Sequence, residues 1–278
     1  MLAGPMERRV RVGTPHLRTI CIILAMAVSV VCAAAELLLP LPSGDVMYRK
    51  GGTDIDASHA DCGYIMVRQK ASNKKLKLRV SHDGTTLTYD LNSNGEYEVF
   101  PLQLGSGKYT VQVFSRISGN KYSTLSSQSF EAQVADETLP FRYPNQYVDY
   151  DADTLAIGRA NDLCSGLDTD RQKLDAISSY VTSTLVYDYL GALTVESGYL
   201  PDLDAVMKKG QGICFDFASL TACMLRSQGI AAKLVIGYAD STYHAWNEAL
   251  IDGEWVHIDN TAVVCGQRIF TYTVERVY

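Results

Sequence analysis

Short runs of alternating apolar and polar residues fill the first half of the chain, from residue 46 to residue 135. Four of these runs cover residues 75–80, 85–89, 96–100 and 109–114, and turn-forming pairs such as Asp83-Gly84 and Asn94-Gly95 separate them. Evenly spaced short strands are typical of a small sandwich. The pattern therefore predicts an N-terminal β-sandwich domain over residues 46–135. It contains no cluster of catalytic residue types, so we expect a spacer or packing partner, with polymer or protein binding as the alternative.

Helical spacing replaces this alternation after residues 135–145, where Pro140 and Pro144 interrupt the pattern. Helices are predicted over residues 154–163, 171–186 and 203–209, and a further helix begins at Cys214 and ends near Gly229. Strands are predicted at residues 231–239, 243–251, 254–260 and 269–277. This order predicts a second, α+β domain over residues 140–278.

A tight hairpin at Asp252-Gly253 fixes the register of two of these strands, because this pair favours a two-residue turn. Pairing outward from the turn places His244 opposite Thr261 and diagonal to Asp259, on one face of the sheet. Diagonal neighbours lie roughly 7–8 Å apart at the backbone, which is within side-chain reach. The register therefore predicts that the imidazole of His244 meets the carboxylate of Asp259.

The same register places His257 opposite Glu248. A structural pair between these two side chains explains His257 without any part in catalysis, and we interpret it in this way.

Cys214 stands where a reactive thiol is expected, at the first turn of the helix that follows Gly210 and Gly212. A thiol is an effective nucleophile only as thiolate, and free N–H groups at a helix start favour an anion. A nearby imidazole favours it further, and a carboxylate behind the imidazole fixes its orientation. Cys214, His244 and Asp259 therefore suit a nucleophile, a base and an orienting acid. For the cysteine taken alone, burial in the core is the alternative.

The segments that carry these residues resemble the transglutaminase-like superfamily, a papain-like group of thiol acyl-transfer enzymes. The resemblance extends over roughly residues 140–278, and it rests on Gly212-Ile213-Cys214-Phe215-Asp216, Tyr243-His244-Ala245-Trp246-Asn247-Glu248 and Trp255-Val256-His257-Ile258-Asp259. It implies a papain-like domain with the catalytic helix packed on an antiparallel sheet. The catalytic triad that it implies is Cys214, His244 and Asp259.

Two positions depart from the family pattern. Asn260 stands where Pro often follows the Asp, and Lys208 stands six residues before the Cys, where papain relatives have Gln. The donor that stabilises the oxyanion is therefore open. Gln211, Tyr187 and the backbone N–H of Cys214 are candidates.

The resemblance implies acyl transfer on protein or peptide amides through a thioester, as in a transglutaminase, a deamidase or a cysteine protease. Amine or water would resolve the thioester, and the sequence leaves this choice open. This mechanism needs no cofactor and no metal, and no Cys/His spacing in the chain has the form of a zinc site. The alternative is a catalytically silent binding or scaffold protein at the cell surface. The intact trio favours the enzyme.

The first 35 residues have the pattern of a secretory signal. An apolar stretch at residues 20–35 ends in three alanines and follows four arginines, Arg8, Arg9, Arg11 and Arg18. We expect a secreted or cell-surface protein; the alternative is an uncleaved membrane anchor that continues through residues 37–39. The net charge of −6 and the absence of a basic run argue against a nucleic-acid partner. The expected partner is a protein or peptide substrate.

Five cysteines follow this segment: Cys62, Cys164, Cys214, Cys223 and Cys265. An odd number in an exported protein indicates a free thiol, which agrees with a reactive Cys214. Cys214 and Cys223 lie nine positions apart on one helix, about half a turn out of phase, so they should not bridge each other. We expect Cys223 in the core. Disulfide pairing among the other cysteines is open.

Overall fold

The computed structural model of the protein describes residues 36–266 and 270–278. The predicted signal or anchor at residues 1–35 lies outside the described residues, and so does the first residue of the strand predicted at 269–277. Among the helices of the described part, none combines the length and the apolar character that crossing a membrane requires.

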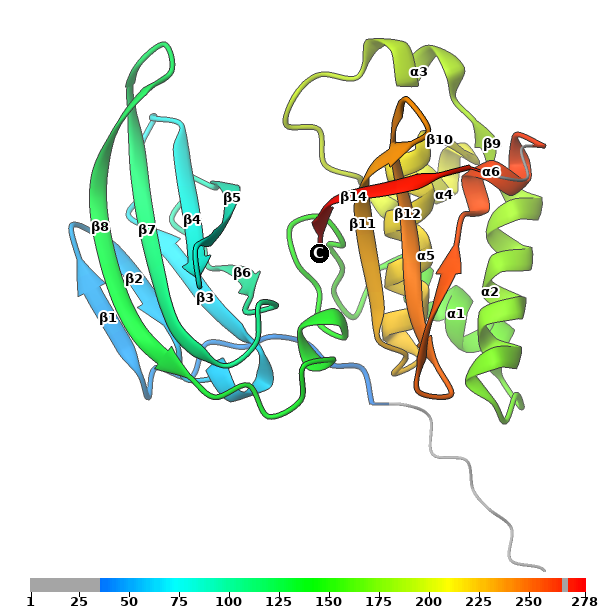
Figure 1. Ribbon diagram of the computed structural model, residues 1–278, viewed down its shortest axis with the longest axis horizontal. Helices are drawn as coiled ribbons and strands as arrows, with labels where there is room; N and C mark the ends of the chain where they lie inside the picture. The colour runs from blue at the N-terminus through cyan, green and yellow to red at the C-terminus, as the bar shows by residue number, and fades with distance from the viewer. Residues whose placement is uncertain (1–35, 267–269) are drawn as a thin grey trace, which may run out of the picture. The chain divides into compact units, whose positions relative to one another are not determined.

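Residues 47–132 form two antiparallel sheets of four strands each (Figure 1). The first has the order β1 (Met47–Lys50), β2 (Thr53–Asp56), β3 (Tyr64–Gln69) and β6 (Glu98–Pro101), and the second has the order β5 (Thr85–Leu91), β4 (Leu76–His82), β7 (Gly107–Ser118) and β8 (Lys121–Ala132). A short 3-10 turn, η1 (Ala60–Cys62), precedes β3. Antiparallel β structure in this part of the chain is confirmed. A sandwich domain with the bounds 46–135 stays a prediction.

Helices dominate the next part of the chain, which begins with the 3-10 turn η2 (Leu139–Phe141). The helices are α1 (Leu155–Cys164), α2 (Asp170–Thr184), α3 (Tyr189–Thr194), α4 (Leu203–Lys209) and α5 (Cys214–Ser227). Four of these five were predicted. The exception is α3, whose six residues are too few for a periodic pattern. Two strands of two residues each pair in parallel: β9 (Val186–Tyr187), which follows α2, and β10 (Gln211–Gly212), which directly precedes α5.

A third antiparallel sheet has the order β13-β12-β11-β14. Its strands are β11 (Ala232–Ala239), β12 (Thr242–Ile251), β13 (Glu254–Ile258) and β14 (Tyr272–Val277), and a short helix, α6 (Asn260–Val264), follows β13. The predicted hairpin register is confirmed, because Ile251 pairs with Glu254 and Glu248 with His257. Asp252 and Gly253 have φ values of 53° and 84°, the left-handed conformation that a two-residue turn requires.

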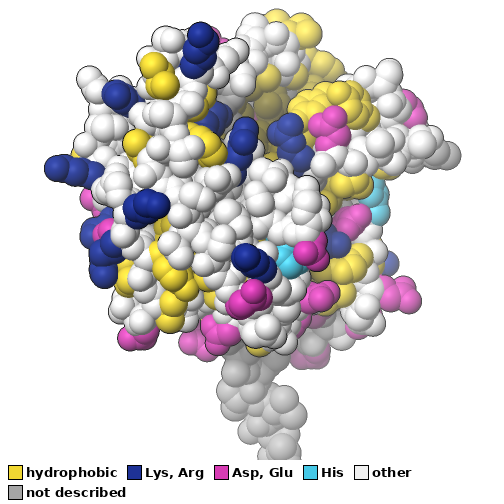
Figure 2. All heavy atoms as spheres, turned by 60° about the vertical axis from the view of Figure 1, so that its left-hand side comes forward, with side chains coloured by type: hydrophobic (Ala, Val, Ile, Leu, Met, Phe, Trp, Pro, Cys, Tyr) yellow, Lys and Arg dark blue, Asp and Glu magenta, His cyan; other side chains and the backbone are white. Residues whose placement is uncertain are grey.

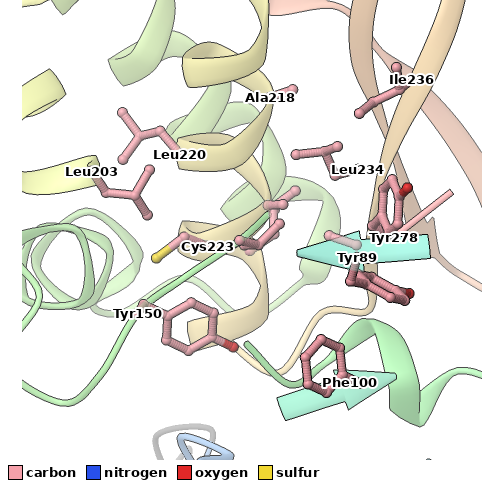
Figure 3. Close-up of a cluster of buried hydrophobic side chains, with 14 of the residues drawn as sticks. Tyr89, Phe100, Tyr150, Leu203, Ala218, Leu220, Cys223, Leu234, Ile236 and Tyr278 are labelled. Carbon is pink, nitrogen blue, oxygen red and sulfur yellow. The ribbon is translucent and has the colours of Figure 1, made fainter. Parts of the chain in front are cut away.

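Helix α5 lies at the centre of the core and packs on β11 and β12 (Figure 1). Figure 3 shows Leu220 of α5 beside Leu203 of α4, with Leu234 of β11 on the other side of the helix. Cys223 is fully buried, as predicted. The Asn247 side chain also donates to the Ala218 carbonyl at 2.9 Å, which holds β12 to the middle of α5.

Arg226 fixes the other end of α5. The residue is 1% exposed, and its guanidinium donates to the backbone carbonyls of Ala232, Tyr143 and Tyr278 at 2.7–3.0 Å. Burial lowers the pKa of Arg226 to about 10, so the side chain is charged at neutral pH. The three carbonyls stabilise this charge, and they join the helix to β11 and to the end of β14.

Charges of both signs are spread over the surface that Figure 2 shows, and neither sign forms one large patch there. Several of the basic side chains have acidic partners, such as Arg68 with Asp54 at 2.8 Å and Lys77 with Asp90 at 2.6 Å.

Candidate active site

Cys214 occupies the first position of α5, and Asp216 fixes the start of this helix. The Asp216 carboxylate accepts the Ile213 backbone N–H through Oδ2 at 2.8 Å and the Tyr199 hydroxyl through Oδ1 at 2.6 Å. Asp216 is the third residue of the helix, and Ile213 directly precedes the helix. A hydrogen bond between these two positions fixes the first turn. The free N–H groups of this turn therefore lie close to Cys214, where they favour a negative charge.

His244 and Asp259 are in direct contact. His244 Nε2 lies 2.8 Å from Asp259 Oδ2, and the two side chains are only 10% and 5% exposed. Burial alone would lower the pKa of His244, but hydrogen bonds with Asp259 and Cys214 and their charges raise it to about 9. Burial would raise the pKa of Asp259, but its hydrogen bond with His244 and the charge of that ring lower it. At neutral pH the pair is therefore an imidazolium and a carboxylate.

The orientation of the His244 ring leaves one nitrogen for the cysteine. Nε2 faces Asp259, so Nδ1 is available to Cys214, which is near enough to help raise the pKa of His244. Such an arrangement can move a proton from a thiol to an imidazole and then stabilise the imidazolium. The structure thus brings together the three residues that the sequence analysis singled out. Their catalytic roles stay a prediction.

Asp259 reaches His244 from a helix start and not from a strand. β13 ends one residue before it, and Asp259 caps α6 by accepting the Ala262 N–H through Oδ1 at 2.8 Å. The predicted strand 254–260 is therefore too long. Thr261 lies within α6 and not opposite His244, whose partner on β11 is Gly237. Aspartate is a strong N-cap residue, and this preference ends the strand early.

Asn260 joins α6 to the helix that carries the cysteine. Its side-chain amide donates to Thr221 Oγ1 of α5 at 3.0 Å, and both residues are buried. A proline at this position could not make this bond. The departure from the family pattern therefore provides a link between α5 and the segment that carries Asp259.

Tyr272 is a site residue that the sequence analysis missed. Its hydroxyl donates to Asp259 Oδ2 at 2.8 Å, the same oxygen that contacts His244. The residue lies in β14, thirteen positions after Asp259. One aromatic residue in a terminal strand cannot be distinguished by sequence from a residue that packs in the core.

The candidate oxyanion donors Tyr187 and Gln211 lie in the parallel pair β9–β10, directly before the start of α5. Burial and the nearby Cys214 raise the pKa of Tyr187 to about 12, so its phenol keeps its proton and can donate. Lys208 pairs with Asp204 on α4 at 3.4 Å. The assignment of an oxyanion donor stays a prediction.

His257 does not form the pair expected for it. It lies opposite Glu248, but in the described part of the chain the Glu248 carboxylate binds Lys233 Nζ at 3.0 Å. The His257 ring instead packs against Tyr272, with 4.3 Å between the ring centroids, and burial lowers the pKa of His257. Aromatic packing therefore replaces the structural pair that was predicted with Glu248.

A cavity of about 670 Å³ adjoins the start of α5. Cys214, His244 and Asp259 do not line it; its walls include Gly212, Ile213, Asp216, Tyr199 and Lys209. Within residues 36–266 and 270–278, no three or more His, Cys, Asp or Glu side chains are grouped as ligands for a metal ion.

Two comparisons with known proteins complement this geometry. The family model of the transglutaminase-like superfamily matches residues 157–260, a range that includes the cysteine, the histidine and the aspartate of the candidate site. A search of the curated proteins found no match.

Solved structures provide further similar chains. The crystal structure of a TGase is 24% identical and covers 41% of this chain, with a TM-score of 0.34; this chain covers 31% of its length. A candidate cysteine protease from Cytophaga hutchinsonii is 14% identical and covers 77% of this chain and 91% of its own, with a TM-score of 0.41. The periplasmic domain of TgpA from Pseudomonas aeruginosa is 15% identical and covers 82% of this chain and 77% of its own, with a TM-score of 0.38. The family match over residues 157–260 therefore carries the assignment: the chain contains a domain of the transglutaminase-like superfamily.

Proposed function

We propose that the chain is a thiol-dependent acyl-transfer enzyme that acts on protein or peptide amides. Cys214 is the nucleophile, His244 is the base and Asp259 orients the imidazole. The observation that supports this proposal is the series of neighbouring groups at a helix start: Cys214 lies near His244 and helps raise its pKa, and His244 is hydrogen-bonded to Asp259. A family match alone would not distinguish an enzyme from a silent relative, whereas this series consists of the groups that take part in the chemistry.

The first half of the reaction forms a thioester. In the resting enzyme His244 already holds the proton as an imidazolium beside the Cys214 thiolate, and this thiolate attacks the carbonyl carbon of the amide to give a tetrahedral oxyanion. The C–N bond then breaks, and the imidazolium returns its proton to the departing nitrogen. The products of this half are an acyl-enzyme and ammonia or an amine.

The second half resolves the thioester. A primary amine gives a new amide and therefore a cross-link, and water gives a carboxylic acid. Attack of water is deamidation when the departing group was the side-chain amide of glutamine, and proteolysis when it was a peptide nitrogen. In each case His244 takes a proton from the attacking group, and Cys214 leaves as the thiolate, which restores the starting state.

The test is mass spectrometry of a glutamine-containing peptide incubated with the protein, with and without a primary amine. A mass increase equal to the amine minus ammonia indicates cross-linking, an increase of about 1 Da indicates deamidation, and two shorter peptides indicate proteolysis. Loss of the product in a folded Cys214→Ala variant assigns it to the thiol.

A silent binding protein is the competing function, and the reactivity of the thiol distinguishes it from an enzyme. Alkylation of Cys214 across pH should be fast well below the pH at which ordinary thiols react. A slow profile of an ordinary thiol, with no product from any peptide, would reject the enzyme and favour the scaffold.

We further propose that the chain is exported and that residues 46–135 form a sandwich which serves as a spacer or packing partner. The basic and apolar pattern of residues 1–35 supports export. Secreted material should then begin near Glu36. Full-length protein retained in the membrane would indicate an anchor instead.

A further inference from the structure

We propose that Tyr272 is a positioning residue of the active site, whose hydroxyl holds the Asp259 carboxylate in the orientation that serves His244. This inference rests on the proposed acyl-transfer function. Tyr272 Oη and His244 Nε2 both lie 2.8 Å from Asp259 Oδ2, and the Ala262 N–H occupies Oδ1 at the same distance. A carboxylate with donors at both oxygens cannot rotate without losing a hydrogen bond.

The hydroxyl of Tyr272 acts as the donor in this contact. Burial and the hydrogen bond to Asp259 raise the pKa of Tyr272, so the phenol keeps its proton at every pH where an enzyme of this type works. A neutral donor on an ionised carboxylate makes a charge-assisted bond, which is stronger than a bond between neutral groups. The bond also disperses part of the negative charge that would otherwise face His244 alone.

A bulge in the last strand places Tyr272 on the catalytic face of the sheet. Ile236 of β11 pairs with Arg276 of β14, but the next residue, Gly237, pairs with Val274. Glu275 is therefore an extra residue in β14. One extra residue reverses the face to which every following side chain of a strand points.

The consequence for Tyr272 follows from the pairing beyond the bulge. Tyr272 pairs with Ala239, so it shares a face with Gly237 and with His244, the partner of Gly237 on β12. In an uninterrupted register Thr273 would oppose Ala239, and Tyr272 would point to the opposite face. Bulges commonly re-aim a side chain next to an active site, and here the re-aimed residue is the phenol that binds Asp259.

Gly237 allows the backbone of β14 to come close to β11 at this point. A β-carbon on Gly237 would overlap the backbone carbonyl of Thr273, so only glycine permits this approach. The bulge sets the face to which Tyr272 points, and the glycine makes room for the backbone beside it. Together they place the tyrosine that hydrogen-bonds to Asp259.

Packing explains the ring of Tyr272 but not its hydroxyl. The ring lies 4.9 Å from that of Trp246 and 4.3 Å from that of His257, measured between centroids. Phenylalanine would fill the same space, and the contact with Asp259 is the hydrogen bond that the hydroxyl adds. Tyr272→Phe therefore separates the positioning role from the packing role.

The expected effect of Tyr272→Phe has two parts. Without the hydroxyl, the Asp259 charge acts more strongly on His244, so the proton stays on the imidazole to a higher pH. The carboxylate is also less well oriented, and we expect kcat to fall about tenfold with little change in KM. The other titratable groups near Tyr272 are His257, from β13, and Asp240, whose charge helps to raise the pKa of Tyr272; neither is altered by this substitution.

The experiment is the pH profile of Cys214 alkylation by iodoacetamide, together with kcat and KM for acyl transfer, in the full chain. Tyr272→Phe should move the inflection due to His244 to a higher pH by about half a unit or more. The control variant is Tyr150→Phe, which removes another buried phenol hydrogen bond, to the Arg142 carbonyl at 3.0 Å, without contact to Asp259. Its profile should match that of the wild type.

Three outcomes would overturn the inference. An unchanged profile and rate in Tyr272→Phe, with an activated thiol in the wild type, overturns this inference alone. A lower melting temperature without a shifted inflection shows a purely structural tyrosine. An ordinary-thiol profile in the wild type overturns the proposed function and this inference with it.

Discussion

Replacement of Asp259 by asparagine should remove a pH-dependent part of the stability. The amide has nearly the shape of the carboxylate, and asparagine is an equally good N-cap, so α6 should still begin at this position. The imidazolium of His244 loses its ionic partner, however. Asp259→Asn is therefore a test of the charge interaction and not of the helix.

The magnitude follows from the pKa of His244. A pKa of about 9 against an ordinary 6.5 is a difference of 9 − 6.5 = 2.5, which corresponds to about 3 kcal/mol of preference for the charged ring. Because the pKa is raised in the folded state, this stabilisation is fully present below pH 6.5 and is lost as the pH rises to about 9. Cys214 contributes part of the shift, so the share of Asp259 is about 2 kcal/mol or somewhat more.

The assay is urea unfolding of the wild type and the variant at pH 6, 7.5 and 9. The wild type should exceed Asp259→Asn by about 2 kcal/mol at pH 6 and by much less at pH 9. The matched control is Asp202→Asn, since Asp202 caps α4 through the Ala205 N–H at 2.9 Å. Its effect should be small and the same at each pH. A difference for Asp259→Asn that stays constant from pH 6 to pH 9 would refute the reasoning.

Three further predictions concern neighbouring positions. Cys223→Ala should lower the free energy of unfolding by about 1 kcal/mol in a denaturant titration and leave alkylation of Cys214 unchanged, because Cys223 is fully buried. Gly237→Ala should lower peptide turnover about tenfold or more, because its new methyl group would displace the Thr273 backbone; wild-type turnover would contradict this. His257→Gln should stay folded and retain most of the activity; an inactive His257→Gln beside an active His244→Gln would reverse the assignment of the base.

The cost of Asp259→Asn in catalysis is a separate measurement. In a Ser-His-Asp triad the corresponding change lowers turnover about 10⁴-fold. A thiolate and an imidazolium attract each other without the acid, so we expect a smaller loss in the assay with the glutamine peptide. Turnover equal to that of the wild type would remove Asp259 from the mechanism.

The parts of the site that could be predicted from the sequence are those that local chemistry determines. The Asp252-Gly253 turn determines the register of β12 and β13, and this register is confirmed. The start of α5 at Cys214 follows from the glycines before it and the apolar spacing after it. Four helices were predicted for the same reason, since each of them is long enough to show a period or carries strong start and stop signals.

The missed parts depend on short elements or on contacts far apart in the chain. Helix α6 has five residues, too few for a pattern, and its cap competes with the strand that was predicted there. Tyr272 meets Asp259 only because a bulge reverses the face of β14, and no local signal marks a bulge that depends on pairing with β11. In β3, four successive buried residues hide the alternation that marks a strand.

The two hydrogen-bonding roles of Asp259 have a consequence for lineages of this fold that lose catalysis. One of its oxygens caps α6 while the other serves His244, so selection for a folded protein alone would retain an aspartate or asparagine at this position. Folding alone does not require a thiol at the start of α5. In a lineage that drifts from enzyme to scaffold, the cysteine should therefore disappear before the acid. An aspartate retained at position 259 therefore does not indicate that activity is retained, whereas a cysteine retained at position 214 does indicate it.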